Sequence, residues 1–157
     1  MIAVLQRAAR AAVTVEGKTV GAIDRGLLVL LGVREGDTET DAELLAAKIA
    51  KCRIFTDEAD RMNLSVADVD GEVLVVSNFT LLANYRRGNR PDFMDAAAPA
   101  RADELYRYFT ELLRRELRHV ATGEFGADMQ IELMADGPVT IVMDSEVLKQ
   151  PKRGATR

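Results

Sequence analysis

The first 33 residues alternate short apolar runs with turn residues, a pattern typical of β-strands. The chain opens with the runs IAVLQ, AAVTV and TVGAI, and the continuous apolar run LLVLLGV follows them. Turn residues stand at Glu16-Gly17-Lys18 and at Asp24-Arg25-Gly26. Because the last run shows no polar alternation, we expect it to form a strand that is buried on both faces.

The segment from about Thr38 to Lys51 has the spacing of an amphipathic helix. Either Asp37 or Thr38 can cap its first turn, because a short polar side chain there accepts a hydrogen bond from a free backbone N–H. The apolar positions that share one face are Ala42, Leu45, Ile49 and Cys52. Cys52 is therefore expected as a core residue and not as a nucleophile, which would need surroundings that favour the thiolate.

A second helix is expected from Pro99, a residue suited to the first helical position, to about Arg118. The residues expected to form its buried stripe are Leu105, Tyr108, Phe109 and Leu112. The opposite face carries Arg114, Arg115 and Arg118.

Further strands are expected on both sides of the second helix. Asp70-Gly71 is a turn signal of the hairpin type, and it leads into the strand EVLVV. The runs MQIELM and VTIVM, separated by the turn residues Ala135 to Pro138, are expected to form a hairpin-like pair. Strands clustered at both ends around two helices favour an α+β layered sheet packed against those helices over a regularly alternating βαβ chain.

Length and composition indicate one ordinary globular domain, since the chain has 157 residues, of which 48% are hydrophobic and 29% charged. We expect this domain to cover residues 1–148, and the basic stretch KQPKRGATR over 149–157 to be a disordered tail. No apolar run reaches the roughly 18 residues that a membrane span needs. The first arginines follow an apolar run, the reverse of a secretory signal, so cytoplasmic localisation is expected.

Most of the usual catalytic and metal-binding signatures are absent from the sequence. The single cysteine excludes an internal disulfide and a Cys-rich zinc site, and the single histidine, His119, is expected as a surface or helix-end residue. Acidic residues outnumber basic ones by 25 to 21, so nothing in the overall charge indicates nucleic-acid binding. Any contact with RNA must be local.

Two short stretches are harder to explain by packing alone. Residues 77–81 (Ser-Asn-Phe-Thr-Leu) directly follow an apolar strand, and free amides and polar side chains at strand ends commonly bind ligands. The alternative is that Ser77 and Thr80 only cap the next turn. Residues 136–140 (Asp-Gly-Pro-Val-Thr) interrupt a strand pattern, and Pro138 removes a sheet donor. An ordinary turn is the simpler explanation there, since composition alone does not support a cis bond.

Several motifs occur in the order of one known family. They are MIAVLQR at the start, GLLVLLGV, Cys52 to Phe55, MNLSV, VLVVSNFTL, Arg87 to Phe93, GEFGADMQ and DGPVT. By these motifs, over about residues 1–144, the chain closely resembles the D-aminoacyl-tRNA deacylases. The resemblance implies a homodimer of layered α/β/β sandwich subunits, with mostly antiparallel sheets, two main helices on one face and active sites at the dimer interface.

The resemblance also implies a reaction without metal or organic cofactor. It is the hydrolysis of the ester that joins a D-amino acid, or glycine mischarged on tRNA-Ala, to the terminal adenosine of tRNA. The family's Gly-Pro pair has a cis bond and is offered by one subunit to the site of the other, a role that maps onto Gly137 and Pro138. Their carbonyls are expected to hold the substrate's amino group while the backbone excludes an L side chain and lets glycine pass.

The residues that the resemblance implies for catalysis are Thr80, Ser77 and Asn78. Those that it implies for substrate binding are Gly137, Pro138, Phe79, Val139, Thr140 and Arg7. The amides of residues 77–81 are expected to stabilise an oxyanion, Phe79 to lie near the adenosine, and Arg7 to brace the Gly-Pro loop. Because a Thr80 nucleophile has no obvious activator, we favour assistance by the ribose 2′-hydroxyl.

The chain departs from the family motif at Asn78, where the family has glutamine. Asparagine preserves a backbone role, whereas a side-chain role would be weakened by the missing methylene group. Two other functions stay open. One is a small-molecule esterase or amidase that acts without tRNA. The other is a non-catalytic nucleic-acid binding protein, whose contacts would be Arg86, Arg87, Arg90, Arg114, Arg115 and Arg118.

Overall fold

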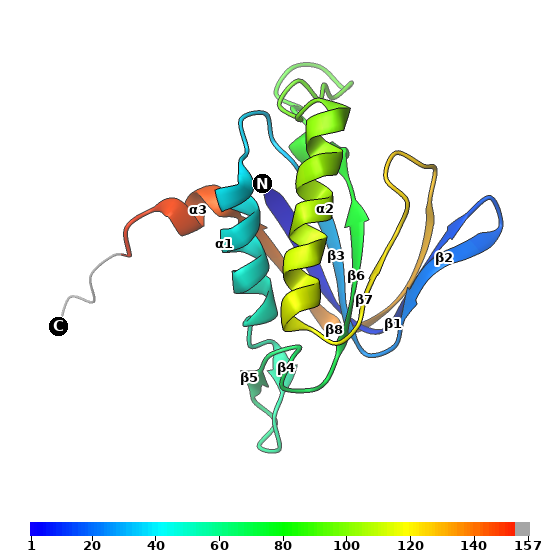
Figure 1. The fold of residues 1–157 in the computed structure, drawn as a ribbon, viewed down its shortest axis with the longest axis vertical. Helices are drawn as coiled ribbons and strands as arrows, with labels where there is room; N and C mark the ends of the chain where they lie inside the picture. The colour runs from blue at the N-terminus through cyan, green and yellow to red at the C-terminus, as the bar shows by residue number, and fades with distance from the viewer. Residues whose placement is uncertain (153–157) are drawn as a thin grey trace.

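A mixed six-stranded β-sheet with two long helices in front of it forms the body of the molecule (Figure 1). The computed structural model describes residues 1–152. Residues 153–157, which belong to the tail expected over 149–157, lie outside the described residues. The strands are β1 (Ile2–Val15), β2 (Lys18–Ile23), β3 (Gly26–Gly32), β4 (Phe55–Thr56), β5 (Met62–Leu64), β6 (Glu72–Ser77), β7 (Val120–Thr122) and β8 (Gln130–Asp144). The helices are α1 (Glu39–Ala50), the 3-10 turn η1 (Phe79–Leu82), α2 (Pro99–Glu116) and α3 (Ser145–Lys149). Within residues 1–152, no helix combines the length and the apolar character that crossing a membrane requires.

The strand order in the main sheet is β2-β1-β3-β6-β7, with β8 also paired to β1. β3, β6 and β7 run parallel, because α1 and α2 carry the chain back between them. Their register places Leu31 opposite Ser77, so the C-terminal ends of β3 and β6 lie side by side. β1 is antiparallel to β2, β3 and β8. The expected antiparallel description therefore covers only part of a mixed sheet.

The two long helices begin where the sequence predicts. α1 follows a capping box in which the Thr38 N–H donates to Asp41 Oδ2 (2.9 Å), and α2 starts at Pro99. α1 ends at Ala50, so Cys52 lies beyond the helix and is half-buried instead of being a full core residue.

The buried stripe of α2 differs in part from the prediction. Leu105 and Phe109 are fully buried as expected, but Tyr108 and Leu112 are only half-buried. The buried residues of the helix are Ala102, Leu105, Tyr106, Phe109, Thr110 and Leu113. The stripe is wide because α2 packs against α1 as well as against the sheet, so one line of apolar positions does not describe it.

The expected hairpin between MQIELM and VTIVM is wrong. From Gln130 on, both runs belong to the single strand β8, which pairs with β1 before and after residues 136–139. The expected strands IAVLQ and AAVTV are likewise one strand. Between the pairs Ala8–Ala135 and Gln6–Thr140, residues 136–139 face a single residue of β1 and form a bulge instead of a reversal. The Gly137–Pro138 peptide bond within this bulge is cis. The chain continues because β1 offers pairing partners on both sides of the bulge.

Two apolar cores lie on opposite faces of the central strands. The larger core is between the sheet and the two long helices. On the other face β2 crosses β7 so closely that a Cβ at Gly21 would lie 2.3 Å from the Thr122 carbonyl oxygen. The residues of this second core are Ala11, Val13, Ile23, Leu28, Leu74 and Val76. β3 and β6 contribute to both cores, which confirms that LLVLLGV is buried on both faces.

Candidate functional site

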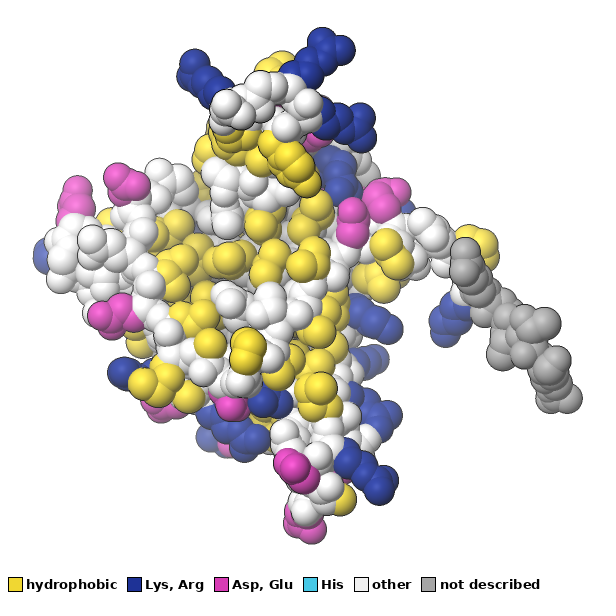
Figure 2. All heavy atoms as spheres, turned by 180° about the vertical axis from the view of Figure 1, so that it is seen from behind, with side chains coloured by type: hydrophobic (Ala, Val, Ile, Leu, Met, Phe, Trp, Pro, Cys, Tyr) yellow, Lys and Arg dark blue, Asp and Glu magenta, His cyan; other side chains and the backbone are white. Residues whose placement is uncertain are grey.

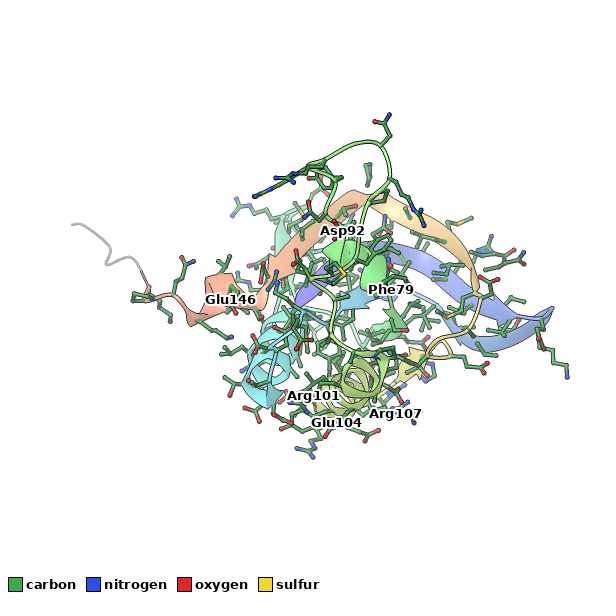
Figure 3. The ribbon with its side chains drawn as sticks, turned by 90° about the horizontal axis from the view of Figure 1, so that it is seen from above. Phe79, Asp92, Arg101, Glu104, Arg107 and Glu146 are labelled. Carbon is green, nitrogen blue, oxygen red and sulfur yellow. The ribbon has the colours of Figure 1, made fainter. Side chains whose placement is uncertain are left out.

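A pocket of about 720 Å³ opens where the C-terminal ends of β3 and β6 meet the start of α2. Figure 3 shows Phe79 at this end of the molecule, beside the segment that carries Asp92. The residues that line the pocket are Leu31, Val33, Ser77–Thr80, Phe93, Ala96–Pro99, Ala102, Tyr106 and Phe125–Met129. Ligands of open α/β sheets bind at the carboxyl ends of strands, and four of the five residues of the stretch 77–81 line this pocket.

The turn after β6 presents hydrogen-bonding groups at the pocket. The Asn78 N–H is already used, since it donates to the Leu31 carbonyl oxygen (2.8 Å). The N–H groups of Phe79 and Thr80 lead η1, where a helix leaves its first donors without an intrahelical acceptor. The Thr80 hydroxyl donates to Asn78 Oδ1 (2.5 Å). The candidate donors to an oxyanion are therefore the backbone N–H groups of Phe79 and Thr80. They lie beside the Thr80 hydroxyl, which the side chain of Asn78 holds.

Aromatic rings form two sides of the pocket. Phe79 packs edge-on against Phe93 with ring centroids 5.1 Å apart, yet Phe79 keeps 58% of its surface exposed. Tyr106 packs against Phe125 at 5.8 Å, and its hydroxyl donates to the Val75 carbonyl oxygen (3.0 Å). Burial raises the pKa of Tyr106 to about 12, so this hydroxyl stays neutral and acts as a wall of the pocket.

Sequence reasoning did not assign the far wall of the pocket, Phe125 to Met129, to the site. This segment connects β7 to β8, and Gly126 turns it with a φ of +77°. The segment belongs to the motif GEFGADMQ, which has no helical or strand periodicity and no histidine, cysteine, serine or threonine. Nothing in the sequence separation between this segment and Ser77 predicts that they line the same pocket.

The Gly-Pro stretch lies at the other end of the sheet. Ser77 is aligned with Leu31 of β3, whereas Arg7, which bonds to Asp136, is aligned with Leu27. Four residues of strand separate these positions, or about 13 Å. Residues 136–140 supply none of the residues described as lining the pocket. One copy of the chain therefore does not bring the two stretches together.

Arg7 connects the Gly-Pro bulge to the body of the protein. Its Nε donates to the Asp136 carbonyl oxygen (3.1 Å) and lies 3.2 Å from Asp136 Oδ2, while its Nη1 donates to the Ile54 carbonyl oxygen (2.8 Å). The Arg7 side chain is nearly buried, whereas Gly137, Pro138 and Thr140 are exposed. Val139 is half-buried and packs against the larger core. The bulge thus projects Gly137 and Pro138 from a base that Arg7 and Val139 anchor.

His119 and Cys52 lie away from the pocket. The carbonyl oxygen of His119 accepts from the Val73 N–H, at the opposite end of β6 from Ser77, and its side chain is exposed. This placement confirms the surface assignment for His119. Burial raises the pKa of the Cys52 thiol, which disfavours the thiolate that a nucleophile needs.

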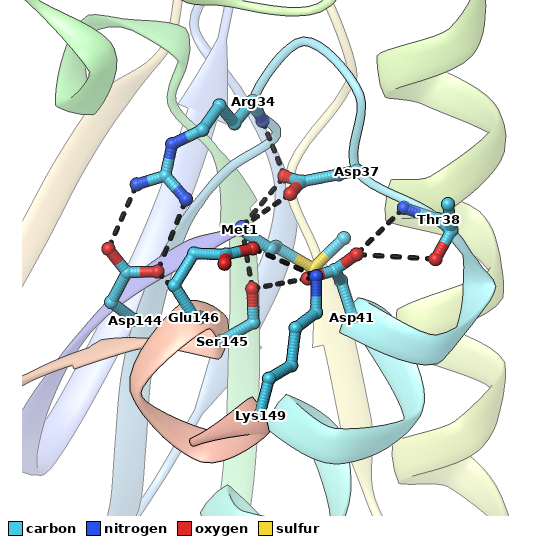
Figure 4. A network of polar contacts seen from close by, with 9 residues as sticks. All are labelled: Met1, Arg34, Asp37, Thr38, Asp41, Asp144, Ser145, Glu146 and Lys149. Atoms are coloured by element: carbon cyan, nitrogen blue, oxygen red, sulfur yellow. Dashed lines mark hydrogen bonds and ion pairs between the residues drawn. The ribbon is translucent and has the colours of Figure 1, made fainter.

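A polar network joins Met1 to α1 and α3 (Figure 4). The Met1 ammonium group donates to Asp37 Oδ1 and to Ser145 Oγ, both at 2.8 Å. Ser145 Oγ donates to Asp41 Oδ1 (2.6 Å), which also pairs with Lys149 Nζ (2.7 Å). Within the described residues, the carboxylates close enough together to hold a metal ion are Asp37, Asp41 and Glu146. Because the ammonium groups of Met1 and Lys149 already pair with these carboxylates, we assign the cluster a structural role.

Known proteins match this chain over nearly its whole length. The profile of the D-Tyr-tRNA(Tyr) deacylase family matches residues 4–144. A D-aminoacyl-tRNA deacylase from Dehalococcoides mccartyi is 55% identical over 152 residues, which are 97% of this chain and 99% of the relative. One from Paracoccus denitrificans is 58% identical over 145 residues, which are 92% and 97% of the two chains.

Two solved structures share the fold. A protein described as a c-Myc DNA unwinding element binding protein is 43% identical and superposes with a TM-score of 0.87, over 92% of this chain and 98% of that one. A probable eukaryotic D-amino acid tRNA deacylase superposes with a TM-score of 0.77, over 91% and 98% of the chains. The second is 17% identical, so it supports the fold alone.

Proposed function

The chain belongs to the D-Tyr-tRNA(Tyr) deacylase family, and we propose that the pocket at the ends of β3 and β6 is the site where it hydrolyses D-aminoacyl-tRNA. The observation that carries this proposal is the position of η1. It places two leading backbone N–H groups and the Thr80 hydroxyl together at a pocket that is walled by aromatic rings. These are the groups that an ester-hydrolysing site without an imidazole base requires.

The reaction transfers the acyl group from the tRNA to water. Water adds to the ester carbonyl carbon, the bond from that carbon to the ribose 3′ oxygen breaks, and the 3′-hydroxyl of the tRNA takes up a proton. Negative charge develops on the carbonyl oxygen, and fixed hydrogen-bond donors stabilise it. The N–H groups of Phe79 and Thr80 supply those donors, and Ser77 at the end of β6 fixes the start of their turn.

Thr80 positions the substrate and does not attack it. A hydroxyl nucleophile needs an adjacent base, and the partner of the Thr80 hydroxyl is the amide oxygen of Asn78, which is not one. Asn78 therefore acts by orienting Thr80. The ribose 2′-hydroxyl of the substrate relays the proton: it accepts one from the attacking water and passes its own to the departing 3′ oxygen. Both oxygens belong to the ribose that carries the ester, so the relay is held next to the reacting carbonyl.

The terminal adenosine stacks in the aromatic part of the pocket. Single-stranded RNA bases are bound by aromatic rings, because every base offers a π-face. Phe79 lines the pocket and keeps more than half of its surface exposed, so it can offer a ring to the adenine while Phe93 holds that ring in place.

In a homodimer, Gly137 and Pro138 of one copy of the chain exclude L substrates from the pocket of the other copy. The two stretches are about 13 Å apart along the strand direction alone. A homodimer can bring them together, because the partner's bulge can enter the pocket. Figure 2 shows hydrophobic side chains gathered on the face of the sheet away from α1 and α2. Exposed apolar residues of β8 include Ile131, Met134 and Val142, and a pocket of about 730 Å³ lies between β1, β2 and β8.

The bulge selects by exclusion. Its backbone carbonyls accept hydrogen bonds from the substrate's ammonium group, and its backbone fills the space that an L side chain needs. Arg7 holds the bulge through the Asp136 carbonyl, and Val139 and Thr140 complete the contact surface. Glycine has no side chain to exclude, so glycine mischarged on tRNA-Ala is also a substrate. Because the substrate is a charged tRNA, we propose that the protein acts in the cytoplasm.

The test is deacylation of matched D-tyrosyl-tRNA and L-tyrosyl-tRNA by the purified protein and by its Thr80→Ala variant. We expect rapid loss of the D ester alone, unaffected by a chelator, and a lower kcat in the variant. Equal turnover of both esters would contradict chiral selection. Salt-dependent binding of tRNA without release of amino acid would show a binding protein instead of an enzyme.

A further inference from the structure

A tight loop stands above the pocket and is not used by the proposed chemistry. This basic loop, residues 84–92, is closed at its base by two backbone hydrogen bonds between Asn84 and Asp92 (2.8 and 3.0 Å). The Asn84 side chain also accepts from the Arg86 N–H (3.2 Å). The loop is therefore an ordered projection with a fixed base.

Three positive charges fall within five residues of this loop. Arg86, Arg87 and Arg90 are exposed, and Figure 2 shows basic side chains standing out from the loop at the top of the molecule. Among the described residues, no carboxylate lies within 4 Å of their guanidinium groups. The chain as a whole has a net charge of −4, so this cluster is a local exception.

Most arginines at α2 differ in this respect, although Arg115 has no carboxylate within 4 Å among the described residues. Arg107 pairs with Asp103 (3.0 Å), Arg114 with Glu111, and Arg118, just beyond the helix, with Asp70 (3.2 Å). An arginine that already has a carboxylate partner must break that pair to bind a phosphate. The three arginines of the basic loop have no such pair to break before they bind a phosphate.

The loop also carries an exposed aromatic ring. Tyr85 is 79% exposed and stands directly before Arg86 and Arg87. Exposed aromatic rings interleaved with arginines bind single-stranded nucleic acids, because the ring stacks on a base while the guanidinium groups contact phosphates.

The loop is attached to the pocket at both ends. It begins two residues after Leu82, the last residue of η1, and it ends next to Phe93, whose ring contacts Phe79 in the pocket wall. Figure 3 shows the segment of Asp92 and Phe79 together beneath the loop. A strand whose terminal nucleoside occupies the pocket must therefore leave it past this loop.

We propose that the basic loop binds the single-stranded 3′ end of tRNA, with Tyr85 stacked on a base and Arg86, Arg87 and Arg90 on the phosphates that precede the terminal adenosine. This inference rests on the proposed function, since it takes the pocket as the place of the terminal nucleoside. The basic loop thus contributes to the affinity for tRNA, whereas the groups of η1 take part in the chemical step.

Kinetics on two substrates test the proposal. D-tyrosyl-tRNA is compared with 3′-O-D-tyrosyl-adenosine, which has the reacting ester and no phosphate. We expect the triple variant Arg86→Ala, Arg87→Ala, Arg90→Ala to raise KM for the tRNA by about tenfold or more and to lower the slope of log(kcat/KM) against log salt by about two. The kcat at saturation and the relative rate on the nucleoside ester should change by less than about twofold.

A charge-matched control is the triple variant Arg114→Ala, Arg115→Ala, Arg118→Ala, which also removes three positive charges. We expect a change in KM below about threefold. Equal losses in both triple variants would overturn the proposal, because global charge would then explain them. An equal loss on the nucleoside ester would also overturn it, because the loop would then act by shaping the pocket.

Binding of an uncharged RNA oligonucleotide that ends in ACCA separates the loop from the chemistry. We expect Tyr85→Ala to raise its Kd by about tenfold and Tyr85→Phe to leave it unchanged, since phenylalanine keeps the stacking face. If the wild-type protein hydrolyses neither ester, the proposed function fails, while this Kd still decides the role of the loop. A Kd that neither Tyr85→Ala nor the loop triple variant alters would refute the loop proposal alone.

Discussion

At the scale of single residues, Gly137 has a backbone conformation that a larger residue adopts only with strain. Its φ is +141°, and a Cβ there would lie 2.4 Å from the Val139 nitrogen. We expect Gly137→Ala to shift the bulge and to lower the D-over-L ratio of kcat/KM by at least about tenfold. Rates on matched D- and L-tyrosyl-tRNA measure this ratio.

Gly17→Ala is the matched control for that variant. Gly17 also has a positive φ, +76°, but nothing lies within 4 Å of an added Cβ, and it sits in the turn between β1 and β2. Its D-over-L ratio should equal that of the wild type. If Gly137→Ala kept both the wild-type rate and the wild-type selectivity, the bulge would have no role in selecting the substrate.

Asn78 is the second residue with a specific role, because it holds the Thr80 hydroxyl. We expect Asn78→Ala to lower kcat by about fivefold to tenfold with little change in KM, the effect of losing one hydrogen bond of about 1 kcal/mol. Asn78→Gln keeps an acceptor amide and should recover most of the loss. If the alanine variant has wild-type kcat, the Thr80 hydroxyl needs no fixed orientation.

At the scale of elements, α3 is held to α1 by Asp41, and this contact depends on pH. Burial raises the pKa of Asp41, but the bonds from Lys149, Ser145 and Thr38 outweigh it and hold the pKa well below its usual range. A carboxylate whose folded-state pKa is depressed stabilises the fold above its unfolded pKa of about 3.9 and loses that effect as pH falls below it.

Asp41→Asn tests this linkage by urea unfolding at several pH values. We expect the variant to lose about 2 kcal/mol of the free energy of unfolding at pH 7 and progressively less below about pH 4. Asp60→Asn changes an exposed carboxylate in a turn and should show neither effect. A loss in Asp41→Asn that stays constant from pH 7 to pH 3 would mean that the charge of Asp41 is not what stabilises α3.

Local signals predict the elements well and their pairing poorly. The capping residue Thr38 and Pro99 mark helix starts because their effects act within one turn. Residues 135–138 look like a hairpin turn, but β8 continues through them because β1, which is distant in sequence, pairs with both sides. The same limit applies to the site. Residues 77–81 follow a strand and can be identified locally, whereas Phe125 to Met129 reach the pocket only through the tertiary fold.

At the scale of the whole molecule, the separation of the two stretches predicts complementation between two impaired copies. A Thr80→Ala chain lacks one half of the site, and a chain with a disrupted Gly137–Pro138 bulge lacks the other. If the partner's bulge completes each pocket, a mixed dimer contains one intact site, so an equal mixture should regain about a quarter of wild-type activity.

The measurement is D-tyrosyl-tRNA deacylation after the two variants are unfolded together and refolded, with each refolded alone as the control. Light scattering of the same samples gives their mass and should correspond to a dimer. If the mixture has no more activity than the separate variants, each pocket uses the bulge of its own chain or does without one.

The placement of β1 has a consequence for how the protein is made. β1 leaves the ribosome before the other strands of the described sheet, and it lies between β3 and β8, the last of them. More than a hundred residues separate β1 from β8, so at about 5–20 residues per second β1 waits on the order of ten seconds for β8. During that interval one edge of β1 is unpaired, and exposed strand edges pair with other chains. The nascent chain is therefore most exposed to aggregation and to chaperone binding just before synthesis of β8 is complete.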